Sequence, residues 1–93
     1  MSFLERLEEW FKVRGLTEPS RRIFRWVASD YLRFCESKGL TVSKESVVQY
    51  LQSLDISSGN KRWRWNILRR CFQVWGLEWF SVVEEGMYIP KPQ

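Results

Sequence analysis

The chain has 93 residues, of which 15 are Lys or Arg and 11 are Asp or Glu, so its formal net charge is +4. This length supports one domain with a single core, and a hydrophobic content of 44% with 6 Trp and 6 Phe excludes a disordered chain. The absence of His excludes His-based acid–base chemistry and the common zinc sites, and no run of about 18 apolar residues could cross a membrane.

The first predicted helix covers about residues 3–14 and ends at Gly15. Its apolar residues recur at helical spacing, at Phe3, Leu4, Leu7, Trp10 and Phe11.

The second predicted helix covers about residues 18–38, with Thr17 as its N-cap, Pro19 in its first turn and Gly39 as its C-cap. Its buried stripe consists of Phe24, Val27, Ala28, Tyr31 and Cys35. Its outer face is expected to carry Arg22, Arg25, Trp26, Ser29 and Arg33.

The third predicted helix begins at Ser43, which can cap it, and is buried through Val47, Val48, Leu51 and Leu54. We expect the connection over 54–59 to be longer than the tight turn of a helix-turn-helix motif. No alternating strand pattern occurs anywhere, so the sequence predicts an all-α fold.

The fourth predicted helix, within residues 57–76, has two faces of opposite character. The apolar face collects Trp65, Ile67, Leu68, Cys71, Phe72 and Trp75. The opposite face collects Arg62, Asn66, Arg69, Arg70 and Gln73, and Lys61 and Arg64 add charge near the start. This segment holds five basic residues and no acid, whereas residues 17–39 sum to +2, so both segments contribute to a basic surface. Arg and Asn or Gln side chains hydrogen-bond base edges as well as phosphates, which favours DNA as the partner.

Several kinds of chemistry have no motif in this chain. The two cysteines form no CxxC pair, and no glycine-rich phosphate-binding loop occurs. Cys35 and Cys71 lie on apolar stripes and are interpreted as free buried thiols of a protein in a reducing cytoplasm. The chain alone is therefore not expected to be an enzyme, to hold a metal or to need a cofactor.

Three patterns in chain order resemble a known family. Ser20 and Phe24 are followed by Tyr31, Phe34, Gly39 and Leu40. The next helix has Val47, Tyr50, Leu51 and Leu54, and the last has Leu68, Arg69, Arg70, Phe72 and Trp75. These patterns resemble the N-terminal core-binding domain of tyrosine recombinases, the phage integrase and Xer-type proteins, over about residues 3–76. The chain departs from the family in its many tryptophans and in Gly59-Asn60, where Ser or Thr is more usual.

The resemblance implies a four-helix orthogonal bundle with a SAM-like fold that clamps one side of a recombination site. Its DNA contacts would come from the second helix, through Ser20, Arg21, Arg22 and Arg25. On the fourth helix, Arg62, Asn66 and Arg69 are candidates for groove or phosphate contact, and Lys61 and Arg70 for phosphate contact. The family's catalytic residues lie on another domain, so Tyr31, Tyr50 and Tyr88 are not expected to act as its nucleophile.

The same residues leave two other classes open: a helical protein-interaction module and a stand-alone DNA-binding regulator. Trp26 is expected either to pack on the first helix or another domain, or to stack on a sugar or unstacked base. The remaining tryptophans are expected to lie in the core.

The organisation is predicted as a DNA-binding domain over residues 1–77 and a C-terminal extension over 78–93 that resembles the linker to a catalytic domain. The expected partners are double-stranded DNA and that catalytic domain of the same polypeptide, with oligomers only on DNA and no membrane. The expected location is the cytoplasm, associated with the nucleoid when DNA is bound.

Overall fold

A computed structural model describes residues 2–77, which form four α-helices and no strand in that part of the chain. The helices are α1 (Phe3–Arg14), α2 (Glu18–Lys38), α3 (Lys44–Ser53) and α4 (Ser58–Trp75). The predicted all-α fold of four helices is confirmed. The predicted extension, residues 78–93, lies outside the described residues.

The helix boundaries follow local chemistry. Ser2 and Glu5 form a capping box at α1, and the Ser43 and Ser57 hydroxyls each accept a backbone N–H at the start of α3 and α4. Thr17 has the extended backbone of an N-cap, although its side chain makes no capping hydrogen bond. Helices α1, α2 and α4 each end at a glycine in the left-handed conformation, which a residue with a Cβ adopts at a cost.

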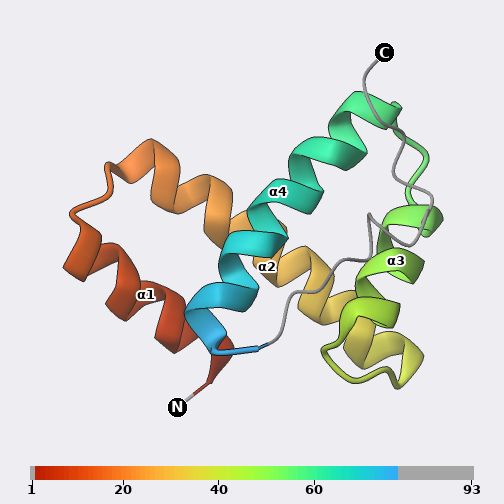
Figure 1. The fold of residues 1–93 in the computed structure, drawn as a ribbon, viewed down its shortest axis with the longest axis horizontal. Coiled ribbons are helices and arrows are strands. Elements are labelled where there is room, and N and C mark those ends of the chain that lie inside the picture. Colours follow the sequence, from red (N-terminus) through yellow and green to blue (C-terminus); the bar gives the residue numbers. More distant parts are fainter. Residues whose placement is uncertain (1, 78–93) are drawn as a thin grey trace.

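Helices α2 and α4 form the centre of the bundle. They pack against each other, and each also packs against α1 and α3, whereas α1 and α3 do not contact each other. Figure 1 shows α4 crossing α2 near the middle, with α1 and α3 on either side. The two central helices are therefore in contact where they cross and do not run alongside each other (Figure 1).

The core is apolar and contains residues from all four helices. Its largest fully buried side chains include Phe11 of α1, Tyr31 of α2, Tyr50 of α3 and Phe72 of α4. Trp75 joins the end of α4 to the start of α1, because its indole Nε1–H donates to the Phe3 carbonyl at 2.9 Å. The predicted apolar stripes of the four helices are the faces that meet in this core, except that Leu4 of α1 is exposed.

Cys35 and Cys71 are free and buried, as predicted. Burial raises the pKa of the Cys71 thiol to about 12, so this residue is protonated at neutral pH and unreactive. None of the described helices is both long and apolar enough to cross a membrane.

The connection between α3 and α4 corrects a prediction. Because α3 ends at Ser53 and α4 begins at Ser58, only the four residues 54–57 separate the two helices. The connection was expected to be too long for a helix-turn-helix motif, and this expectation is wrong. The Ser57 side chain caps the start of α4 by accepting a hydrogen bond from the Asn60 N–H at 3.2 Å.

We predict that Leu68→Ala lowers the free energy of unfolding by about 2–5 kcal/mol, because Leu68 is fully buried in the middle of α4 and its truncation leaves a cavity. Urea denaturation followed by circular dichroism measures the change. The neighbouring exposed Arg69 provides the control, since Arg69→Ala should change stability by less than about 0.5 kcal/mol. Equal losses in both variants would show that the faces of α4 are wrongly assigned.

Candidate nucleic-acid interface

The exposed face of α4 is basic and carries amides. Asn66, Arg69, Arg70 and Gln73 are all exposed and together line a shallow hollow on the helix surface. No carboxylate among the described residues lies within ion-pair distance of Arg69 or Arg70. Two guanidinium groups and two amides therefore share one open surface.

Two further predicted residues lie near the start of α4. Lys61 and Arg62 are half-buried within its first turns. The first turn contains no acidic residue, so the positive end of the helix dipole adds to their charge. Lys61, Arg62, Asn66, Arg69 and Arg70 thus all belong to α4, as predicted.

Arg64, the remaining cation of α4, is part of the core, although the sequence suggested that it adds to the surface charge. Only 11% of its side chain is exposed. Its Nη1 donates to the Tyr50 hydroxyl at 2.6 Å and to Asp30 Oδ2 at 3.2 Å, and the Tyr50 hydroxyl donates to the same Asp30 oxygen at 2.6 Å. Burial, with the Asp30 carboxylate beside it, raises the pKa of Tyr50. Arg64, Asp30 and Tyr50 form a three-helix polar cluster that uses one of the five positive charges of α4.

Trp26 of α2 covers this cluster on its solvent side. The Arg64 guanidinium carbon lies 4.5 Å from the centre of the Trp26 ring, within the range of a cation–π contact. Trp63 of α4 lies next to it, with the ring centres 6.3 Å apart and the planes inclined by 42°. Trp26 is 50% exposed and Trp63 is 40% exposed. Trp26 therefore packs on α4 and not on α1.

The prediction that the other tryptophans lie in the core is confirmed for Trp65 and Trp75, which are buried. Trp10 is partly buried and packs against the core, and Trp79 lies outside the described residues.

The same prediction is wrong for Trp63. The apolar stripe of α4 is centred on Leu68 and Cys71, and Trp63 falls at its edge, where the Trp26 ring lies next to it and 40% of Trp63 stays exposed.

The predicted basic residues of α2 have different surroundings. Arg22 is exposed, with no ion pair among the described residues. Arg21 is half-buried, and its Nε donates to the Leu16 carbonyl at 2.9 Å. Ser20 accepts a hydrogen bond from the Thr17 hydroxyl at 3.2 Å. Arg33 is 75% exposed, with Asp30 Oδ1 4.0 Å from its Nη2.

Arg25 is not part of an open basic face, and its predicted placement is corrected. Its guanidinium forms a two-pronged ion pair with Glu8 of α1, including a contact of 3.1 Å between Nη2 and Oε1. Nη1 also bonds Glu18 at 3.1 Å, and the group lies 5.5 Å from the Phe11 ring centre. Two carboxylates around one guanidinium leave a net negative charge, so Arg25 joins α1 to α2 and is a poor contact for an anion.

The structure thus brings only part of the predicted surface together. Arg22 lies one turn before Trp26 on α2, and Asn66 lies one turn after Trp63 on α4. The two exposed faces meet at the contact between Trp26 and Trp63. The sequence indicated Trp26 as a candidate for stacking, but Trp63 was missed, because it was expected to lie in the core and instead pairs with Trp26 at the surface.

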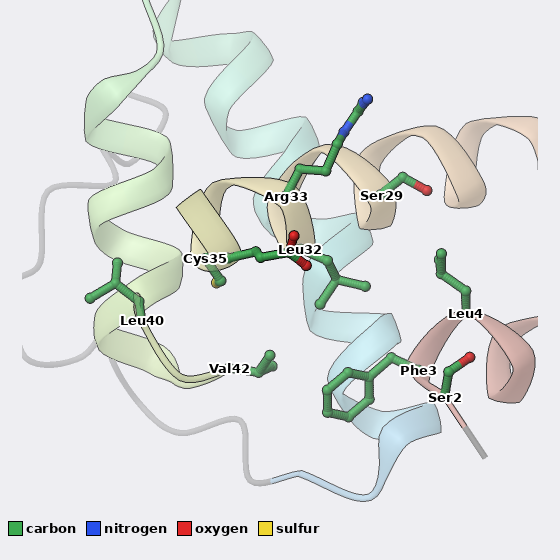
Figure 2. A pocket seen from close by; sticks show the side chains of 10 residues that line it. Ser2, Phe3, Leu4, Ser29, Leu32, Arg33, Cys35, Leu40 and Val42 are labelled. Atoms are coloured by element: carbon green, nitrogen blue, oxygen red, sulfur yellow. The ribbon is translucent and has the colours of Figure 1, made fainter. Parts of the chain in front are cut away.

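A separate groove of about 670 Å³ lies where the start of α1, the second half of α2 and the α2–α3 connection meet. Its lining is mainly apolar, and Figure 2 shows Phe3, Leu32 and Val42 approaching one another while Arg33 points away. No group of three or more potential metal ligands occurs among residues 2–77.

Comparison of the chain with protein-family models, with curated proteins and with solved structures gives no match. Any function assigned to this site therefore has to be argued from its geometry.

We predict that Arg25→Ala makes the stability of the fold less sensitive to a fall in pH. Arg25 lowers the pKa of Glu8, mainly through its hydrogen bonds, so this pair stabilises the fold fully above the ordinary Glu pKa. The stabilisation is lost as the pH falls through the lowered pKa of Glu8. The melting temperature of Arg25→Ala should lie below that of the wild type at neutral pH, and the difference should shrink towards pH 3. Arg33→Ala, a charge-matched change on the same helix, should show no such convergence.

Proposed function

We propose that this domain binds double-stranded DNA through the exposed face of α4, together with neighbouring residues of α2. The observation that carries the proposal is the open surface formed by Asn66, Arg69, Arg70 and Gln73, on a helix without any acidic residue. A solvated helix face usually mixes both signs of charge, whereas this face carries one sign.

The chemistry of these side chains fits duplex DNA. Guanidinium groups neutralise phosphates and release counterions, which supplies most of the sequence-independent affinity. Arg and Asn or Gln also form paired hydrogen bonds with guanine and adenine edges in the major groove, into which an α-helix fits. Arg69 and Arg70 would supply charge, and Asn66 and Gln73 the amides. Arg62 extends the same face towards the positive end of the helix dipole, and Lys61 adds charge beside it in the first turns.

In finer terms, we propose the core-binding domain of a tyrosine-type site-specific recombinase. Support comes from the patterns on residues 20–40, 47–54 and 68–75 together with a bundle of four helices. On α2, Arg22 would contact phosphate and Ser20 would lie near the DNA. Arg21 and Arg25 would instead hold the bundle together. The domain would supply binding energy and orientation to a catalytic domain of the same polypeptide, in the cytoplasm of its cell.

A stand-alone regulator with a helix-turn-helix motif is the second candidate, favoured by the four-residue connection between α3 and α4. In that motif the second helix enters the major groove, with its N-terminal residues on the bases. Asn60, Lys61 and Arg62 occupy those positions in α4. Residues of α2 would then have little part in binding.

A protein-interaction module would be expected to expose one large apolar patch. Within residues 2–77, the exposed large apolar residues are instead divided among three helices: Leu4, Val13, Ile23, Trp26 and Trp63.

We predict that Arg69→Ala and Arg70→Ala each weaken binding to duplex DNA and reduce the slope of log affinity against log salt by about 1. The wild-type domain should bind with a dissociation constant of about micromolar or weaker, because it makes few phosphate contacts. Fluorescence anisotropy across a salt series measures both quantities. Arg14→Ala, which removes one charge from α1, is the control and should leave the slope unchanged. Binding that is insensitive to salt would contradict the proposal.

The two DNA-binding candidates assign DNA contacts to different residues, Arg22 of α2 in one and Asn60 of α4 in the other. Under the recombinase proposal, we predict that Arg22→Ala on α2 weakens duplex binding about as much as Arg69→Ala does. Under the helix-turn-helix alternative, Asn60→Ala would reduce the preference for a selected site over a scrambled duplex, and Arg22→Ala would have no effect. Competition binding with the selected and scrambled duplexes separates the two.

A further inference from the structure

Trp26 and Trp63 form an exposed aromatic pair where the outer faces of α2 and α4 meet. An indole is a large apolar group, and leaving half of it in water gives up much of the free energy that its burial would supply. Both residues lie outside the hydrophobic core of the described part of the chain. The core therefore does not account for two tryptophans at this position.

The Trp26 ring is supported from inside the protein. The Arg64 guanidinium lies 4.5 Å from the ring centre, and Tyr50 and Asp30 hold that guanidinium in turn. The side chain of Arg64 is nearly buried, so its position is determined by three helices and not by solvent. A ring supported in this way loses little conformational entropy when a planar ligand packs on its exposed side.

The surroundings of the pair are polar and positively charged. Arg22 lies one turn from Trp26, Arg62 precedes Trp63 in the sequence, and Asn66 lies one turn beyond Trp63. Grooves that bind single-stranded nucleic acid combine these two elements, cations that follow the phosphates and aromatic rings on which bases stack. A ligand complementary to this surface is planar and apolar on one side and carries anionic charge beside it.

We infer that the Trp26–Trp63 pair is a stacking platform for unpaired nucleotides in a single-stranded stretch that adjoins the duplex bound by α4. Bases within an intact duplex already stack on their neighbours, so they offer no free face to an indole. This inference rests on the proposed DNA-binding function and adds a second class of nucleic acid to it. It assigns the duplex to Arg69 and Arg70 and the unpaired bases to the two tryptophans.

A protein partner fits the same surface less well. Only Ile23, Trp26 and Trp63 are exposed large apolar residues on α2 and α4, and cations border them. Stable protein interfaces need a wider apolar centre with few charges in it.

The test compares two DNA molecules of the same sequence, one fully paired and one with a short single-stranded gap. The wild-type domain should bind the gapped duplex more tightly. Trp26→Leu keeps an apolar side chain over Arg64 but has no aromatic face, so it should reduce the preference for the gap by about five- to hundredfold. Its affinity for the paired duplex should stay close to that of the wild type. Trp63→Leu should act in the same direction, and Trp26→Phe should retain most of the preference.

Arg69→Ala is the matched control, because it should weaken binding to both DNA molecules and leave the preference for the gap intact. Thermal melting verifies that each variant is folded, and Trp63→Leu decides the question if Trp26→Leu does not fold. Equal affinity of the wild type for both DNA molecules, or an unchanged preference in the folded leucine variants, would overturn the inference while leaving duplex binding in place. Failure to bind either DNA would reject the proposed function as well. Self-association that Trp63→Leu abolishes would assign the pair to a second copy of the chain and overturn the inference.

Discussion

The buried guanidinium of Arg64 is the interaction on which the arrangement of the bundle and its surface depends. A charge removed from water is costly unless it is paired and hydrogen-bonded, and here α2 supplies Asp30 while α3 supplies Tyr50. The three residues bring α2, α3 and α4 together at one point, near the crossing of the two central helices. An apolar residue at position 64 could pack in many ways, but a guanidinium with two partners requires one geometry. The same group supports Trp26 from below, so it links the core to the surface.

Some of the arginines pair with groups inside the bundle and others stay open on its surface, and the net charge of the chain does not reveal this division. Arg64 and Arg25 are both bound by carboxylates of other helices, and Arg21 is bound to a backbone carbonyl. The cations that remain open on α4 and α2 are fewer than the sequence suggests, but they are concentrated. Arg69 and Arg70 lie on one side of α4 with two amides, and Arg22 lies beyond the tryptophan pair. The proposed binding of DNA rests on this concentration of positive charge.

The crossing of α2 and α4 limits how the two helices can act together. Their exposed faces meet at Trp26 and Trp63, and Figure 1 shows the ends of the two helices diverging from their crossing. The short 54–57 connection also joins α3 to α4 closely, so α3–α4 and α2–α4 are both structural pairs that could meet DNA. The two alternatives differ in whether α2 contacts the DNA. Substitutions of Arg22 and of the tryptophan pair therefore distinguish between them.

The sequence by itself determined the helices and their buried stripes, because caps, glycines and a 3.6-residue period are local properties. Leu68, Phe72 and Trp75 follow from the period of α4 alone, as does the exposure of Asn66, Arg69 and Arg70. Only the tertiary structure decided the residues at the edges of those stripes and the partners of Arg64. The period of α4 places this cation on the buried stripe, four residues before Leu68. The angle of Arg25, Arg64 or Trp63 around its own helix does not reveal what a neighbouring helix places beside it. Glu8 lies 17 residues before Arg25 and Asp30 lies 34 before Arg64, so these ion pairs exist only after the helices have packed.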